Sequence, residues 1–296
     1  MTALHPCGVF SAALTPITAE HVPDHALFVT HCRRLLAEGC DGIAMLGTTG
    51  EANSFTSDER RALLEAVVGA GIPAERLLPG TGVAALSETV ALTRHALSLG
   101  VTTVVMLPPF YYKGVTEDGL FAAYAEVVER LADRRLRIVL YHIPQMSAVP
   151  IPFAVIARLR AAFPGTFTGI KDSAGDLAHM EALVEAFPSL AVLAGADPLM
   201  LPLLRKGGAG CITATSNIVA ADLAFVFRHF ADPDRASEVE AAQARIVAMR
   251  NRASRFAQMA SLKALLADRT AELGWHRLRP PLLPLSPAER SALLDD

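Results

Sequence analysis

The chain has 296 residues, of which 52% are apolar and 19% are charged, and this balance supplies a large core and excludes an intrinsically disordered protein. The net charge is −3 and no basic run occurs, so the sequence gives no support for a nucleic-acid partner. Residues 1–10 lack the pattern of a signal peptide, and no apolar run reaches the roughly 18 residues of a membrane span. We therefore expect a cytoplasmic protein without membrane association.

One alternation repeats eight times along the first three quarters of the chain. A short apolar or β-branched run ends in a polar or glycine turn, and an amphipathic helix follows. The expected strands are 8–18 with its loop, 41–46, 76–82, 101–107, 137–141, the run into Lys171, 190–195 and 210–215. The expected helices are 24–38, one from 56, 87–100, 117–131, 152–162, 176–187, one after Asp197 and 218–230.

Eight strand–helix units favour an α/β protein with a closed parallel barrel, the (β/α)8 TIM barrel, over an open sheet. No G-x-G-x-x-G motif follows the first strand, which argues against a dinucleotide-binding fold. After residue 232 the alternation stops, and helices are expected near 238–251, near 255–268 and after Pro287. We predict a catalytic barrel over 1–232 and a C-terminal helical extension over 233–296 that packs on it.

Local signals at the helix starts refine this prediction. Thr56 followed by Glu59 has the spacing of a capping box. Asp197 before Pro198 has the pattern of a helix N-cap with proline at the first helical position.

Cysteine and histidine spacing supports neither disulfides nor a metal site. The four cysteines have no C-x-x-C spacing, so each is expected to be a reduced, buried thiol. His21 and His25 are four residues apart, but Pro23 between them argues against a shared helix face. We predict no bound metal.

The C-terminal ends of the strands should hold the functional residues, because in a parallel barrel they all open on one face. The polar residues expected there are Thr48, Thr49, Tyr111, Tyr112, Tyr141, Lys171, Asp197 and Asn217. Three of the four tyrosines of the chain belong to this set. This concentration favours a functional role for Lys171 over a purely structural one.

Lys171 is the candidate nucleophile. It ends an apolar run, whereas the other three lysines, including Lys263, stand in loop-like or helical polar surroundings. Desolvation favours the neutral amine, which can condense with a ketone to form a Schiff base. The alternative is a lysine that reaches solvent or pairs with Asp172.

The other residues fit the same chemistry, each with a plainer alternative. Glycines around Thr48 and Thr49 allow backbone N–H groups to hold a carboxylate, although the loop could be a simple tight turn. A tyrosine hydroxyl can relay protons, but Tyr141 could also fill the barrel. For Asp197 and Asn217, a helix cap and a structural role respectively are the simpler interpretations.

Five motifs together resemble a known family, the dihydrodipicolinate synthase and N-acetylneuraminate lyase superfamily, across about residues 8–230. They are Gly47-Thr48-Thr49-Gly50-Glu51, Pro109-Phe110-Tyr111-Tyr112, Tyr141-His142-Ile143-Pro144, Gly169-Ile170-Lys171-Asp172 and Gly195-Ala196-Asp197. In the tail, Arg279-Pro280-Pro281 resembles the C-terminal region of the family as well.

The resemblance implies a (β/α)8 barrel that assembles as a homotetramer of two tight dimers, with no metal or organic cofactor. It implies that Lys171 forms the Schiff base with pyruvate or another 2-keto acid and that Tyr141 relays protons above it. Thr48 and Thr49 would hold the keto-acid carboxylate, with the Thr48 hydroxyl also in the relay. Tyr111 would reach into the site of a neighbouring subunit. Further substrate-binding positions implied are Gly47, Ser173, Gly195, Asp197 and Ile212.

Departures from the family pattern bear on the second substrate. Dihydrodipicolinate synthases carry an arginine five residues after the relay tyrosine, where this chain has Met146, which cannot pair with a carboxylate. N-acetylneuraminate lyases carry Asp-Glu where this chain has Asp197-Pro198. The loop 109–114 is more similar to that of 2-keto-3-deoxy sugar acid aldolases.

We therefore expect a Schiff-base lyase or aldolase that uses a 2-keto acid such as pyruvate with a second aldehyde or sugar-acid substrate, or a related dehydratase. The first alternative is dihydrodipicolinate synthase itself, with the carboxylate held from elsewhere. The alternative of another class is a non-catalytic barrel that only binds keto acids.

Overall fold

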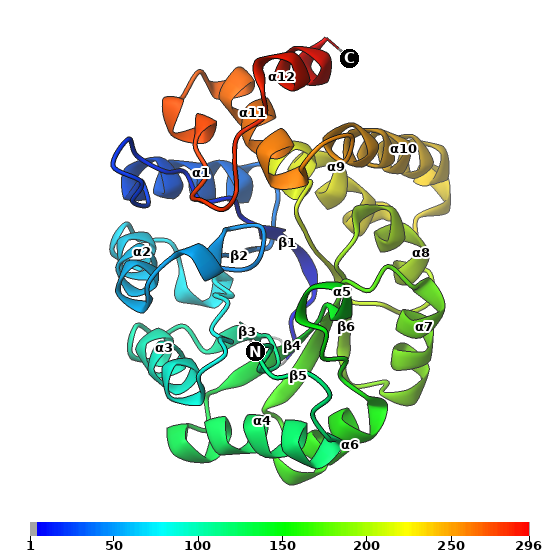
Figure 1. Cartoon of the computed structure of the whole chain (residues 1–296). Helices are drawn as coiled ribbons and strands as arrows, with labels where there is room; N and C mark the ends of the chain where they lie inside the picture. Colours follow the sequence, from blue (N-terminus) through cyan, green and yellow to red (C-terminus); the bar gives the residue numbers. More distant parts are fainter. Residues whose placement is uncertain (1–4, 296) are drawn as a thin grey trace.

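A ring of parallel strands surrounded by helices, with further helices on one side, forms the computed structural model of residues 5–295 (Figure 1). Residues 1–4 of the predicted barrel domain and residue 296 of the predicted extension lie outside the described residues. No helix in the described range is long and apolar enough to cross a membrane.

The sheet has seven assigned strands in the order β2-β1-β7-β6-β5-β4-β3, each pairing in parallel with its neighbours. Their bounds are β1 Gly8–Ala12, β2 Gly42–Ala44, β3 Thr103–Met106, β4 Arg137–His142, β5 Phe167–Asp172, β6 Ala191–Ala194 and β7 Gly210–Thr213. The strands are buried almost throughout, as expected for parallel strands covered on both faces.

The prediction of a regular third strand over 76–82 is wrong, but this segment still closes the ring between β2 and β3. Leu78 and Gly80 donate N–H groups to carbonyls in and beside β2, at 2.9 and 2.8 Å. The Pro79 carbonyl accepts from the N–H of Val105 in β3 at 3.0 Å. Proline has no N–H to donate, so the ladder is interrupted here. The (β/α)8 architecture is confirmed.

Helices alternate with the strands around the ring. The α-helices of the barrel are α1 His25–Ala37, α2 Ser57–Gly69, α3 Leu86–Ser98, α4 Glu117–Leu131, α5 Pro144–Ser147, α6 Phe153–Ala162, α7 Leu177–Ala186, α8 Met200–Leu204 and α9 Ser216–His229. Short 3-10 turns are η1 Ala52–Ser54, η2 Ala74–Arg76 and η3 Asp197–Leu199. The predicted capping box of Thr56 and Glu59 is confirmed at the start of α2.

Asp197 does not cap a helix as predicted. The N-cap of η3 is Ala196, and the Asp197 carboxylate accepts from the Thr215 hydroxyl at 2.8 Å. The Asp197 carboxylate thus binds the Thr215 hydroxyl instead of the backbone N–H groups that a helix cap would bind.

The prediction that all cysteines are buried is correct for Cys32, Cys40 and Cys211 but wrong for Cys7, which is exposed. Cys7 precedes the first buried strand, whereas Cys32 lies on the packed face of α1, Cys40 in the buried connection before β2 and Cys211 in β7. All four are free thiols.

Strand alternation fixes which side chains enter the barrel. Successive residues of a strand point to opposite faces, so Val139 and Tyr141 of β4 face the barrel interior. Leu140 between them packs outward against the helices. The interior cluster consists of Phe10, Ala12, Ala44, Leu78, Val105, Val139, Tyr141, Ile143, Leu193 and Ile212. This apolar filling leaves the C-terminal end of the barrel as the place for polar groups.

The tail folds into helices that pack beside the barrel, and the boundary at residue 232 stays a prediction. Its elements are η4 Pro233–Arg235, α10 Ala236–Ala253, α11 Gln258–Thr270, η5 Leu273–His276 and α12 Pro287–Leu294. Helices α10 and α11 both contact α9 (Figure 1). Trp275 is 1% exposed and packs with Leu14 from the barrel, so a single apolar cluster joins the two parts.

A buried ion pair also joins them. Lys263 of α11 donates from Nζ to Glu51 Oε1, and to the Arg277 carbonyl at 2.8 Å. The second Glu51 oxygen accepts the backbone N–H of Arg279 at 2.9 Å. Lys263 is therefore fully buried, contrary to the polar surroundings expected from sequence, because the face of α11 around it is covered and Glu51 supplies the opposite charge.

We predict that Lys263→Met lowers the free energy of unfolding by about 3–5 kcal/mol, because Glu51 is left buried without its cation. Urea denaturation measures the loss. The double variant Glu51→Gln/Lys263→Met should regain part of it, and Lys206→Met serves as the exposed control. A loss no larger than that of the control contradicts the prediction.

Candidate active site

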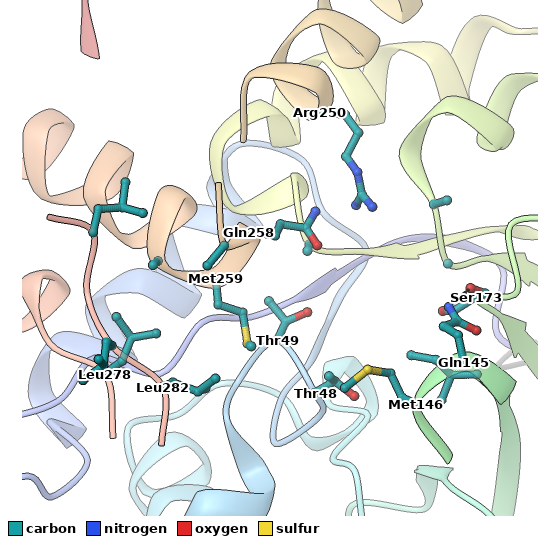
Figure 2. Close-up of a pocket in the computed structure, with 18 of the residues that line it drawn as sticks. Thr48, Thr49, Gln145, Met146, Ser173, Arg250, Gln258, Met259, Leu278 and Leu282 are labelled. Atoms are coloured by element: carbon teal, nitrogen blue, oxygen red, sulfur yellow. Dashed lines mark hydrogen bonds between the residues drawn. The ribbon is translucent and has the colours of Figure 1, made fainter. Parts of the chain in front are cut away.

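A cavity of about 910 Å³ opens at the C-terminal ends of the strands. Barrel residues and extension residues line it together (Figure 2). The barrel supplies Thr48, Thr49, Tyr141, Ile143, Gln145, Met146, Lys171, Ser173, Gly195, Ala196, Ile212 and Ala214. This volume lies near the upper end of the range for small-molecule sites, so the cavity has room for more than a three-carbon acid.

Lys171 and Tyr141 are directly opposed across neighbouring strands. The register of β4 and β5 pairs them residue to residue, and both side chains point into the barrel mouth. The Lys171 Nζ lies 4.1 Å from the centroid of the Tyr141 ring. Both residues are buried, with 6% and 5% exposure. The ring face therefore fixes the position of the amine at the base of the cavity.

The hydroxyl of Tyr141 joins a small polar cluster. It lies 3.4 Å from the Thr48 hydroxyl. Burial by itself raises the pKa of Tyr141, but the charge of Lys171 and hydrogen bonds from Thr48, Lys171 and Ser173 outweigh this and lower the pKa below its usual value. A phenol in this environment exchanges a proton more readily than a free tyrosine.

The loop that carries Thr48 and Thr49 is held from several sides. The Thr15 hydroxyl donates to the Gly50 carbonyl at 2.8 Å. A side chain at Gly50 would place its Cβ 2.9 Å from the carbonyl oxygen of Ala13, so only glycine fits there without movement. Glu51, next in the chain, forms the buried ion pair. Both threonines therefore face the cavity from a fixed loop, and their role in carboxylate binding stays a prediction.

Ser173 and Gly195 meet at the ends of β5 and β6. The N–H of Gly195 donates to the Asp172 carbonyl at 2.7 Å, and the N–H of Ser173 donates to the His142 carbonyl at 2.8 Å. A Cβ on Gly195 would overlap Ser173 Oγ and lie 2.8 Å from the Asp172 oxygen. Gly195 thus allows Ser173 to turn into the cavity next to Lys171.

The structure brings seven of the predicted site residues to this cavity: Thr48, Thr49, Tyr141, Lys171, Ser173, Gly195 and Ile212. Three others lie elsewhere. Gly47 is outside its lining, and Asp197 is fully buried behind it. Tyr111 is 73% exposed on the loop after β3, with its ring 5.2 Å from that of Tyr112.

Asn217 has a structural role, consistent with the simpler interpretation. Its amide nitrogen donates to the carbonyls of Ala12 and Ala214, at 2.9 and 2.7 Å. Its amide oxygen accepts from the N–H of Leu14 at 3.0 Å and lies 2.8 Å from His31 Nε2. These contacts join the end of β1 to the start of α9.

His142 of β4, Asp172 of β5 and His179 of α7 form a cluster whose potential ligand atoms lie within 4.8 Å of one another. His142 Nδ1 accepts the N–H of Ile151 at 3.2 Å, so the ring proton of a neutral His142 is on Nε2. His179 Nδ1 lies 2.6 Å from Asp172, and the two imidazole rings stack at 5.0 Å. This geometry indicates a hydrogen-bonded support for β4 and β5 rather than a set of metal ligands.

The sequence did not reveal the wall that the extension contributes. Its members include Arg250, Gln258, Met259, Leu278 and Leu282 (Figure 2). Arg250 and Gln258 belong to helices whose sequence pattern predicts packing only. No motif singled them out, because their role depends on how the tail folds back over the barrel.

Comparison with known proteins identifies the family. The model of the dihydrodipicolinate synthetase family matches residues 5–296. The chain belongs to this family. It is 39% identical over 290 residues to an uncharacterised DapA-like lyase of Chloroflexus aurantiacus, a match that covers 97% of this chain and 95% of that relative. Membership of the family supports an enzyme of the lyase class.

Two solved structures of family members have the same fold. Dihydrodipicolinate synthase of Agrobacterium tumefaciens C58 is 32% identical, with a TM-score of 0.85 and 96% coverage of both chains. A prophage protein of the family from E. coli K12, in complex with pyruvate, has a TM-score of 0.88 at 23% identity, over 97% of this chain and 96% of that one.

We predict that Gly195→Ala lowers activity at least about tenfold, because the added methyl group displaces Ser173 beside Lys171. A steady-state activity assay measures the effect. Gly69→Ala is the matched control, since a Cβ there meets no atom within 4 Å. Equal activity in the two variants would show that activity does not depend on the present position of Ser173.

Proposed function

We propose that the protein is a class I lyase in which Lys171 forms a Schiff base with pyruvate or a related 2-keto acid. The observation that carries the proposal is the buried Lys171 amine, 4.1 Å from the Tyr141 ring and facing the cavity that Thr48 and Thr49 also line. Membership of the dihydrodipicolinate synthetase family supports it.

The proposed reaction begins with attack of the neutral Lys171 amine on the C2 carbonyl of the keto acid. The carbinolamine then loses water to give the imine. Tyr141, with the Thr48 hydroxyl 3.4 Å away, gives a proton to the departing hydroxyl. Thr48 and Thr49 hold the adjacent carboxylate.

The Tyr141 phenolate left by this step takes a proton from C3 of the imine, which gives an enamine and restores the phenol. The enamine adds to the carbonyl carbon of an aldehyde, and the reverse sequence cleaves the same carbon–carbon bond. Hydrolysis of the imine then releases the product and restores the amine. In the proposed homotetramer, the exposed Tyr111 completes the site of a neighbouring subunit.

Dihydrodipicolinate synthase is the second candidate, favoured by the 32% identity to the Agrobacterium enzyme. The position of Met146 argues against it, because this cavity residue cannot pair with the carboxylate of the second substrate. Turnover of pyruvate with aspartate semialdehyde, compared with a panel of other aldehydes and sugar acids, separates the candidates. A keto-acid sensor would bind pyruvate without a covalent adduct.

We expect borohydride to trap pyruvate on the native protein as a reduced adduct on Lys171, detected by intact mass and peptide mapping. Lys171→Ala should give neither adduct nor turnover. Lys206→Ala, which removes an exposed lysine, should behave like the native protein. Binding of pyruvate without an adduct, or appreciable turnover by Lys171→Ala, would refute the lyase mechanism.

We expect Tyr141→Phe to reduce kcat by about 100-fold or more, because it removes the proton-transferring hydroxyl but keeps the ring against Lys171. Circular dichroism should show a folded protein. A near-normal rate in that folded variant would exclude Tyr141 from the proton relay.

A further inference from the structure

The extension places a positive charge in the cavity, away from the keto-acid end. Arg250 of α10 lines the cavity, and in Figure 2 its guanidinium points into it. Its side chain is 28% exposed, so the charge is only partly solvated. The surrounding lining is largely apolar and includes Met146, Met259 and Leu282. A guanidinium in such surroundings favours a ligand of opposite charge.

The contacts that Arg250 makes within the protein leave N–H donors of its guanidinium available to a ligand. Arg250 Nη1 lies 3.5 Å from Asp197 Oδ2, which is longer than a close charge-assisted hydrogen bond. Asp197 is already engaged by the Thr215 hydroxyl, and burial raises the pKa of Asp197. Asp197 therefore orients the arginine without occupying its planar set of five donors. The acidic residue in the cavity lining, Glu289, accepts from Ser286 in the capping box of α12.

A second donor lies beside the same part of the cavity. Gln258 is the first residue of α11, and its side-chain Nε2 is buried without a hydrogen-bond partner among the described residues. In Figure 2, Gln258 and Arg250 extend into the cavity from the same side. A buried amide donor without a partner carries a desolvation cost that a ligand acceptor would remove. Rotation of the Gln258 amide about its terminal torsion would turn this donor toward the cavity, where it and the Arg250 guanidinium would suit one anionic group.

We propose that Arg250, assisted by Gln258, binds a carboxylate or phosphate carried by the aldehyde partner of the keto acid. This inference rests on the proposed function and adds the charge class of its second substrate. It also accounts for Met146, because the cation that holds the second substrate comes from α10 instead of α5.

Matched aldehydes test the proposal, each with pyruvate as the donor. Succinic semialdehyde is compared with butanal, and glyceraldehyde 3-phosphate with glyceraldehyde, so the two pairs distinguish a carboxylate from a phosphate. In the native enzyme we expect kcat/KM to favour the anionic member of at least one pair by roughly 10- to 100-fold. Arg250→Met should abolish this preference and leave the neutral aldehyde within about threefold of its native value.

Two controls make the result specific. Arg245→Met removes an arginine of the same helix that pairs with Asp222 at the surface, and it should keep the native preference. Borohydride trapping of pyruvate is measured on every variant. Failure of the native protein to trap pyruvate refutes the proposed function. If trapping is normal, the aldehyde comparison tests the anion site alone.

With normal trapping, the anion site is refuted if the native enzyme prefers no anionic aldehyde. It is also refuted if Arg250→Met slows neutral and anionic aldehydes by the same factor. Gln258→Met should reduce the preference for the anion to a smaller degree, because it removes a neutral donor and leaves the guanidinium.

Discussion

The ion pair between Glu51 and Lys263 is the constraint on which the cavity depends. Both side chains are buried, and each supplies the opposite charge that the other needs in the interior. Glu51 ends the loop that carries Thr48 and Thr49, while Lys263 belongs to α11 of the extension. The pair therefore joins the two parts of the chain at the edge of the cavity. Separation of the parts would expose an apolar cluster and break the ion pair.

The repeating pattern of the sequence predicts the barrel because its physical origin is local. Each strand must be apolar on both faces, and each helix must be apolar on one. Once the strands are parallel, their ends converge, so the residue pattern alone suffices to place Lys171 and Tyr141 on one face. Their register across β4 and β5, with the amine 4.1 Å from the ring, follows from which strands become neighbours.

What the sequence could not predict depends on contacts between distant segments. Pro79 interrupts the hydrogen-bond ladder of segment 76–82, whose other residues are typical of a strand. Asp197 has the local pattern of a cap, yet Thr215 provides a better placed donor. The polar sequence around Lys263 predicts an exposed side chain, but the ion pair with Glu51, which is distant in sequence, makes its burial possible. Arg250 and Gln258 enter the cavity only because the tail folds back over the strand ends.

The two walls of the cavity come from separate parts of the fold. The residues proposed for covalent chemistry stand at the ends of strands, where a shift of the backbone would disturb the whole ring. Arg250 and Gln258 stand on helices at the rim, where one side chain can change with little effect on the sheet. This separation gives the fold a route to divergence, since new substrates can be acquired by mutation of the rim helices while the inherited reaction is preserved.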